Sequence, residues 1–191
     1  MHTLVLFDID GTLVRGGPAK GSFHAAMLET FGTVGAMDSY DFSGKTDPQI
    51  VRDLLAAAGL EDTVIDAGLA GLWDRYIGEL ESRISTNPMR LLPGVAGLIE
   101  ALDSEPEVAL GLVTGNIVRG AQVKLGSVGL AECFEVGGYG SDHEVREHLP
   151  AIALERAFEA WGVSFPPESA VIVGDTPRDV ECGKHAGTRT V

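Results

Sequence analysis

The sequence predicts an α/β protein in which a doubly wound parallel sheet is interrupted, after its first strand, by an α-helical insertion. From about residue 95 onward, short apolar segments alternate with segments of helical periodicity, which is the pattern of a parallel sheet covered by helices. Residues 15–90 carry apolar positions at helical spacing and no convincing strand. We therefore assign residues 1–14 and 91–191 to an α/β core domain and residues 15–90 to an inserted helical domain.

Each expected element rests on a local pattern. Residues 3–7 form a short apolar run, typical of a strand that is buried on both faces. Asp47 and Pro48 favour a helix start, because Asp caps an N-terminus and Pro fits the first turn. The expected strands cover residues 3–7, 108–113, 134–136 and 170–173, and the expected helices cover residues 18–31, 47–58, 61–85, 95–103, 117–128, 149–161 and 178–186.

Glycine and proline mark the connections between these elements. Residues 15–18 and the pair Asn87-Pro88 predict turns at the two ends of the insertion, and residues 33–46 predict a loop. The last residues, 188–191, begin a further strand inside which the sequence stops. We expect the chain to be cut there, which would leave an exposed and incomplete sheet edge.

Composition restricts the class of partner. The chain has 191 residues, 45% of them hydrophobic, and a net charge of −14, which disfavours nucleic acid and anionic membranes. Its two cysteines, Cys133 and Cys182, give neither a disulfide framework nor a zinc-binding spacing. No signal peptide is visible, and no apolar run reaches the ~18 residues of a membrane helix. We expect a cytoplasmic protein that acts on a small molecule.

Two carboxylates follow the first expected strand. Asp8 and Asp10 are two positions apart, so their side chains can point the same way where the strand ends, and Gly11 suits a turn and the close approach of a ligand. Two like charges at a buried strand end are costly unless a cation or a shared proton compensates them. An isolated Asp-x-Asp is equally compatible with a solvated turn.

Two later strands also end in polar residues. Thr114-Gly115-Asn116 offers a hydroxyl, an unobstructed amide and a side-chain amide at a helix start, which together suit an anion. Asp175 and Asp179 add carboxylates after residues 170–173. Each segment alone is compatible with an ordinary helix cap. Aspartates clustered at the carboxyl ends of neighbouring strands, without matching cations, predict a hard divalent ion such as Mg²⁺.

The segment from Ser141 to His148 is the expected source of positive charge. Arg146 offers a permanent charge and a forked set of donors for a phosphate, whereas the charge of His148 would depend on pH. A solvated loop is the alternative interpretation of this segment.

Together these segments resemble the motifs of the haloacid dehalogenase superfamily of phosphohydrolases, and within it the phosphoglycolate-phosphatase-like branch. Residues 8–13, Asp-Ile-Asp-Gly-Thr-Leu, match the leading signature in full, residues 114–116 resemble the second motif and residues 174–179 the fourth. The resemblance spans nearly the whole chain and implies a Rossmann-like core. It also implies that residues 15–90 are an α-helical cap, in which residues 44–47 are similar to a cap segment of that branch.

By this resemblance, Asp8 is the nucleophile and forms an aspartyl-phosphate. Asp10 is the general acid that protonates the leaving group and then the base that activates water. Mg²⁺ is held by Asp8, Asp175 and the backbone carbonyl of Asp10, with Asp179 supporting the metal shell.

The resemblance also assigns the phosphate site, with one departure. Thr114, Gly115 and Asn116 bind the transferring phosphoryl group. The third motif is usually a lysine, but no lysine lies between Lys124 and Lys184, so Arg146 takes that place. In the cap, we expect Lys45 to contact the substrate, although a solvated surface lysine would look the same.

The predicted function is therefore magnesium-dependent hydrolysis of a small phosphomonoester, phosphoglycolate-like or a sugar phosphate. A phosphomutase or a haloacid dehalogenase could use the same core, and a phosphonatase would need a cap lysine such as Lys45. Asp10 argues against the dehalogenase, which has no oxygen leaving group to protonate. A phosphate-sensing protein without activity is the non-enzymatic alternative, and the intact Asp8, Asp10, Thr114 and Asp175 argue against it.

Overall fold

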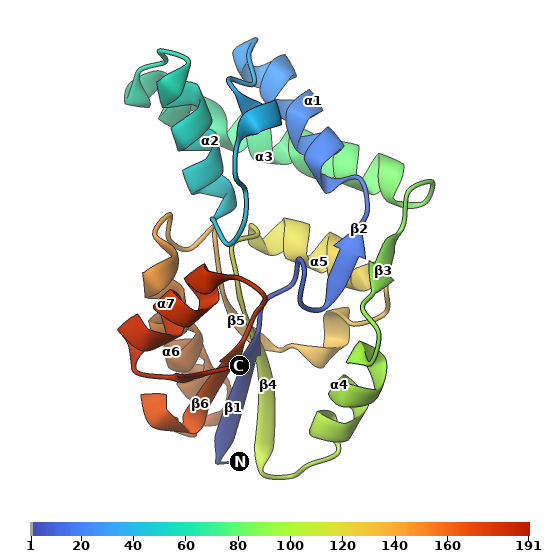
Figure 1. Ribbon diagram of the computed structural model, residues 1–191, viewed down its shortest axis with the longest axis vertical. Coiled ribbons are helices and arrows are strands. Elements are labelled where there is room, and N and C mark those ends of the chain that lie inside the picture. Colours follow the sequence, from blue (N-terminus) through green and yellow to red (C-terminus); the bar gives the residue numbers. More distant parts are fainter. Residues whose placement is uncertain (1) are drawn as a thin grey trace.

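The computed structural model describes residues 2–191 and shows a parallel five-stranded sheet in the order β5-β4-β1-β6-β7 (Figure 1). The strands are β1 (Thr3–Phe7), β4 (Val108–Thr114), β5 (Val136–Tyr139), β6 (Ala170–Val173) and β7 (Arg189–Thr190). β1 lies between β4 and β6, with Phe7 level with Leu112 and Val173. The predicted fold class and the adjacency of the three site-bearing strands are confirmed.

Strand β1 is buried on both faces, as its apolar run predicts. Val5 and Phe7 pack on one face of the sheet, and Leu4 and Leu6 pack on the other, because successive strand side chains alternate. Helices α4 (Val95–Asp103) and α5 (Val118–Gly126) contribute to the first of these cores, and α6 (Leu149–Trp161) and α7 (Pro177–Ala186) contribute to the second.

The insertion is helical and has a hydrophobic core of its own. Its helices are α1 (Ala19–Phe31), α2 (Asp47–Ala57) and α3 (Asp62–Ile84), and they lie above the carboxyl ends of the strands in Figure 1. Thr46, rather than Asp47, caps α2, since its hydroxyl accepts a hydrogen bond from the Gln49 amide at 3.2 Å. We call α1, α2, α3 and the residues that connect them the helical layer.

Two short strands lie within and beside residues 15–90, where the sequence predicts no strand. β2 (Val14–Gly16) and β3 (Met89–Leu91) pair antiparallel and form a ribbon between the sheet and the helical layer (Figure 1). Three residues are too few to show a period of two, and the partner strands are far apart in sequence, so no local pattern marks them.

The expected strand at 134–136 is displaced, because β5 runs from Val136 to Tyr139. The strand is difficult to predict from residue propensities because it contains Gly137 and Gly138, and glycine is depleted in strands. Packing requires Gly138: a Cβ there would lie 2.1 Å from the backbone oxygen of Leu149 at the start of α6. The glycine therefore permits the close approach of α6 to the edge of the sheet.

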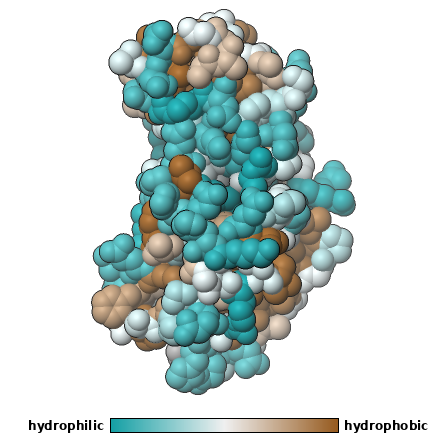
Figure 2. Space-filling model, turned by 60° about the vertical axis from the view of Figure 1, so that its left-hand side comes forward, coloured by the Kyte–Doolittle hydropathy of each residue, from teal (hydrophilic) through white to brown (hydrophobic). Residues whose placement is uncertain are grey.

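The other edge of the sheet is β7, which is two residues long and is followed by Val191, 79% exposed. None of the helices in residues 2–191 has the combination of length and apolar character needed to cross a membrane. Hydrophilic side chains cover most of the face shown in Figure 2, in keeping with the net charge of −14.

Candidate active site

A cavity of about 440 Å³ lies between the carboxyl ends of β1, β4 and β6 and the helical layer. Most of the residues singled out in the sequence line it: Asp8, Asp10, Lys45, Gly115, Asn116, Arg146 and Asp175. Parallel strands that end at the same edge of a sheet thus bring together residues from distant parts of the chain.

Asp8 is a buried carboxylate held by a buried arginine. Its side chain is 8% exposed, and its Oδ1 accepts a hydrogen bond from Nη2 of Arg146 at 3.0 Å. The same Nη2 donates to Oδ1 of Asp179 at 2.6 Å. Burial raises the pKa of Asp8 to about 6, and the Arg146 charge opposes that rise. Arg146 therefore bridges two carboxylates at the floor of the cavity.

The structure places Arg146, and not His148, beside Asp8. His148 is exposed and its ring lies 4.2 Å, between centroids, from that of His143. The short 3-10 helix from Arg146 to His148 therefore buries the arginine and leaves the histidine exposed.

Three carboxylates form a group that suits a divalent cation. One oxygen each from Asp8, Asp175 and Asp179 lies within 4.8 Å of the others. Gly11 makes room for Asp175: its φ is +93°, and a Cβ there would lie 2.1 Å from the Asp175 Oδ2. An all-oxygen, anionic donor set is the set that Mg²⁺ prefers, so the residues present fit this ion.

Asp179 is the most restrained of the three carboxylates. Its Oδ2 accepts hydrogen bonds from the Thr176 amide at 3.0 Å and from the Thr176 hydroxyl at 2.7 Å. Because Arg146 occupies Oδ1, both oxygens have partners. This arrangement suits a residue that supports neighbouring ligands more than one that binds a metal directly.

Asp10 lies at the cavity with its side chain 47% exposed and its Oδ2 held from two directions. Lys124 Nζ donates to this oxygen at 2.6 Å and Asn116 Nδ2 at 2.8 Å. Burial raises the pKa of Asp10, but Lys124 and Asn116 outweigh it and hold this pKa below its ordinary value. Asp10 and Asp8, two residues apart, therefore have pKa values shifted in opposite directions.

The loop after β4 carries the expected hydroxyl and amides. Thr114 is fully buried beneath the cavity, and its hydroxyl accepts a hydrogen bond from Asn116 Nδ2 at 2.8 Å. Gly115 lies against the helical layer, where a Cβ would come within 2.1 Å of the backbone oxygen of Lys45. Its own carbonyl accepts a hydrogen bond from the Asp47 amide at 2.7 Å. The helical layer therefore touches the sheet at the site.

The profile of the haloacid dehalogenase-like hydrolases matches residues 5–191, which is nearly the whole chain. The chain belongs to this family of hydrolases. A phosphoglycolate phosphatase from Rhodobacter capsulatus is 29% identical over 98% of this hydrolase and 82% of the relative. An N-acetylmuramic acid 6-phosphate phosphatase from Pseudomonas putida is 30% identical over 97% of this chain and 80% of the relative.

Solved structures show the same fold. CbbY from Rhodobacter sphaeroides, solved in complex with phosphate, superimposes with a TM-score of 0.67 at 22% identity and covers 100% of this hydrolase and 85% of its own chain. The structure of a putative phosphoglycolate phosphatase from Lactobacillus plantarum superimposes with a TM-score of 0.65 at 23% identity, over 100% of this chain and 86% of its own.

Lys45, expected at the substrate, lines the cavity of this hydrolase with its charge already paired. Its Nζ donates to Asp53 Oδ2 at 2.8 Å and to the Tyr40 hydroxyl at 2.6 Å. The expectation of a substrate contact thus faces a structural alternative, in which Lys45 ties the segment before α2 to α2 itself.

The sequence analysis did not predict two charged groups at the site, the buried Lys124 and the half-buried Asp47. Lys124 is 4% exposed, and Ile117, Ala121 and Lys124 recur at helical spacing on the buried side of α5, which is the signal that could have found it. Asp47 has its Oδ2 2.9 Å from the amide of Ile117, just before α5. Burial lowers the pKa of Lys124, but the nearby Asp10, Tyr76 and Asp47 raise it by more, so this pKa lies above its ordinary value.

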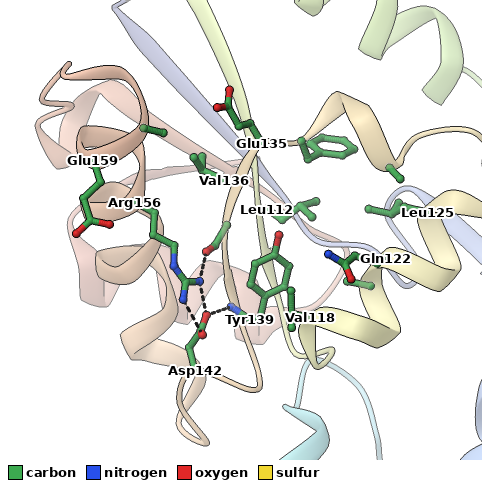
Figure 3. Close-up of a pocket in the computed structure, with 15 residues that line it drawn as sticks. Leu112, Val118, Gln122, Leu125, Glu135, Val136, Tyr139, Asp142, Arg156 and Glu159 are labelled. Atoms are coloured by element: carbon green, nitrogen blue, oxygen red, sulfur yellow. Dashed lines mark hydrogen bonds and ion pairs between the residues drawn. The ribbon is translucent and has the colours of Figure 1, made fainter. Parts of the chain in front are cut away.

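A second and larger cavity, about 570 Å³, lies at the β5 edge of the sheet between α5 and α6 (Figure 3). Among the described residues that line it, the one basic group is already paired: Arg156 contacts both carboxylate oxygens of Asp142, at 2.5 and 2.8 Å, and the Gly137 carbonyl at 2.6 Å. None of the residues that line it belongs to the predicted site. The reactive groups are therefore in the smaller cavity.

The Asp47→Asn variant should change how the stability of this hydrolase depends on pH. Burial raises the pKa of Asp47 from 3.8 to about 6, with Lys124 and the Ile117 amide opposing the rise. The native state therefore binds this proton more tightly than the unfolded state, and the free energy of unfolding falls as pH rises from about 4 to about 6. D47N lacks this titrating carboxyl group, so its free energy of unfolding, relative to that of the wild type, should increase as the pH rises between these values.

Urea titrations at pH 4 and pH 7, with EDTA present, measure this difference. The exposed Asp38 supplies the control variant D38N, which should track the wild type at both pH values. A stability difference between D47N and the wild type that is equal at the two pH values would contradict the assignment.

Proposed function

We propose that this hydrolase cleaves a phosphate monoester in two steps through an aspartyl-phosphate on Asp8. The observation that supports this most is the different placement of the two aspartates after β1: Asp8 is buried against Arg146 and beside the carboxylates of Asp175 and Asp179, whereas Asp10 is half-exposed at the cavity beside Lys124. Two neighbouring carboxyl groups in different environments are suited to different tasks.

In the first step, an oxygen of the Asp8 carboxylate attacks phosphorus and the bond from phosphorus to the ester oxygen breaks. Asp10 gives a proton to that departing oxygen, which leaves as an alcohol. In the second step, Asp10 takes a proton from water as the water oxygen attacks phosphorus, which releases phosphate and restores Asp8. A covalent intermediate replaces one difficult displacement with two easier ones.

The surrounding residues supply position and charge. Arg146 and Gly115 line the cavity and would bind the equatorial oxygens of the phosphoryl group. Asn116 lines it too, but its NH₂ group donates to Asp10 and to the buried Thr114 hydroxyl, so its side chain would orient Asp10. Asp8, Asp175 and the backbone carbonyl of Asp10 would hold Mg²⁺, with Asp179 in support. When bound, this ion neutralises charge on the phosphoryl oxygens and so reduces their repulsion of Asp8. Residues 15–90 act as a cap that excludes water from the cavity.

We further propose that the substrate carries a carboxylate, which Lys20 of the helical layer recognises. Four cations line the cavity, and three of them are paired with carboxylates: Lys45, Lys124 and Arg146. Lys20 is exposed, lies 5.3 Å from the centre of the Phe42 ring, and has no ion pair within residues 2–191. The names of the two phosphatase relatives both denote phosphorylated carboxylic acids. A small acid that carries a phosphate would place its two anionic groups at Arg146 and Lys20.

The Asp10→Asn variant tests the proposed mechanism. Its kcat/KM for an alkyl phosphate such as glycerol 3-phosphate should fall by ~10²–10⁴-fold, which is what a general acid typically contributes. Its kcat/KM for para-nitrophenyl phosphate should fall far less, because nitrophenolate leaves without a proton. The assay includes Mg²⁺, and EDTA should abolish the wild-type activity reversibly. Equal losses on the two esters would refute the role of Asp10, and release of halide from a 2-haloacid by the wild type would indicate a dehalogenase.

The Lys20→Met variant tests the carboxylate. It should raise the KM for 2-phosphoglycolate about fivefold or more, equivalent to ~1 kcal/mol for a partly exposed ion pair. The KM for glycerol 3-phosphate, whose leaving group is uncharged, should stay within about twofold. Lys184 is an exposed lysine away from the cavity, and K184M is the matched control. A K20M variant that affects both substrates alike would exclude recognition of a carboxylate by this lysine.

A further inference from the structure

Lys124 is a buried ammonium group that lines the cavity and points at Asp10. It lies near the C-terminal end of α5, is 4% exposed, and has its Nζ 2.6 Å from Asp10 Oδ2. The same Nζ lies 2.5 Å from Asn116 Oδ1. A lysine is rarely buried unless it is paired, and these two contacts account for its position.

These contacts form a connected network rather than a single ion pair. Lys124 donates to the Asn116 oxygen, which leaves the Asn116 NH₂ group to donate to Asp10 at 2.8 Å and to the Thr114 hydroxyl at 2.8 Å. The orientation of the Asn116 amide, and through it that of the Thr114 hydroxyl, is therefore set by Lys124. The network thus fixes Thr114, Asn116 and Lys124, which lie on β4, the following loop and α5, relative to the Asp10 carboxylate just after β1.

The network has a direct consequence for the two oxygens of Asp10. Lys124 and Asn116 both donate to Oδ2. Oδ1 is therefore the oxygen left to exchange a proton with a bound ester. A carboxylate held at one oxygen by two donors has little freedom to rotate, and a misplacement of a catalytic group by about 1 Å can cost 10²-fold in rate.

We propose that Lys124 is a positioning residue that holds the Asp10 carboxylate in the orientation needed for proton transfer, and that fixes Asn116 and Thr114 in the same network. The proposal rests on the proposed role of Asp10 in hydrolysis. Lys124 itself touches neither the ester nor the phosphoryl group in this account, so its whole effect passes through Asp10 and its neighbours.

The Lys124→Met variant keeps most of the volume of the side chain and removes the charged donor. It should lower kcat/KM for glycerol 3-phosphate by about tenfold or more, and kcat/KM for para-nitrophenyl phosphate by much less, because only the first ester needs a proton from Asp10. K184M serves again as the control lysine variant. A residue that merely supports the fold would reduce both activities by the same factor.

A double-mutant cycle with D10N provides the second readout. If Lys124 acts through Asp10, adding K124M to D10N should change the hydrolysis of glycerol 3-phosphate by less than about twofold, since the group it positions is already disabled. The same loss in the D10N background as in the wild type would overturn the proposal, as would an unchanged kcat/KM in K124M alone.

The folding of each variant is checked by its far-UV circular dichroism and melting temperature. Should K124M fail to fold, K124L replaces it in the same two comparisons, since a leucine side chain also lacks a hydrogen-bond donor. A wild-type protein that hydrolyses neither ester would refute the proposed function itself. A wild type that hydrolyses both, with a K124 variant that matches it, refutes only the positioning role.

Discussion

The burial of the Asp8 carboxylate is the constraint on which the arrangement of the site depends. Asp8 ends a strand that is covered on both faces, so its charge has little access to water. A buried charge is tolerated only where a partner compensates it, and removal of one partner of a buried pair typically costs 3–5 kcal/mol. Arg146 is that partner, and because it also contacts Asp179 it joins the end of β1 to the start of α7.

The distribution of charge explains how a chain with a net charge of −14 could bind an anionic substrate. Acidic residues are spread over the protein, while Lys20, Lys45, Lys124 and Arg146 are gathered around one cavity. Three of these cations are balanced by carboxylates and hold the walls of the cavity in place. The contact of Gly115 with Lys45 and Asp47 holds the helical layer against the sheet, at the loop where we propose that the phosphoryl group binds.

The sequence allowed the sheet, the adjacency of its three central strands and most of the helices to be predicted, because long apolar and helical patterns are local. β5 was displaced since Gly137 and Gly138 satisfy a packing requirement, set by α6, that no local pattern shows. β2 and β3 were not predicted because each forms by pairing with the other, which is distant in the sequence. In the site, the aspartates were foreseen from their spacing, but the pairing of Lys45 with Asp53 and of Lys124 with Asp10 depends on tertiary structure alone.

The proposed mechanism requires that Asp8 carries the phosphoryl group, and trapping that group on the protein is the sharpest test of it. The enzyme is mixed with para-nitrophenyl phosphate and Mg²⁺, quenched in acid within a turnover, and reduced with borohydride, which converts an aspartyl-phosphate to homoserine. Peptide mass mapping should then find homoserine at position 8 in the wild type, only when substrate was present, and never in D8N. Steady hydrolysis with no mark at Asp8, or with the mark on another residue, would contradict the account.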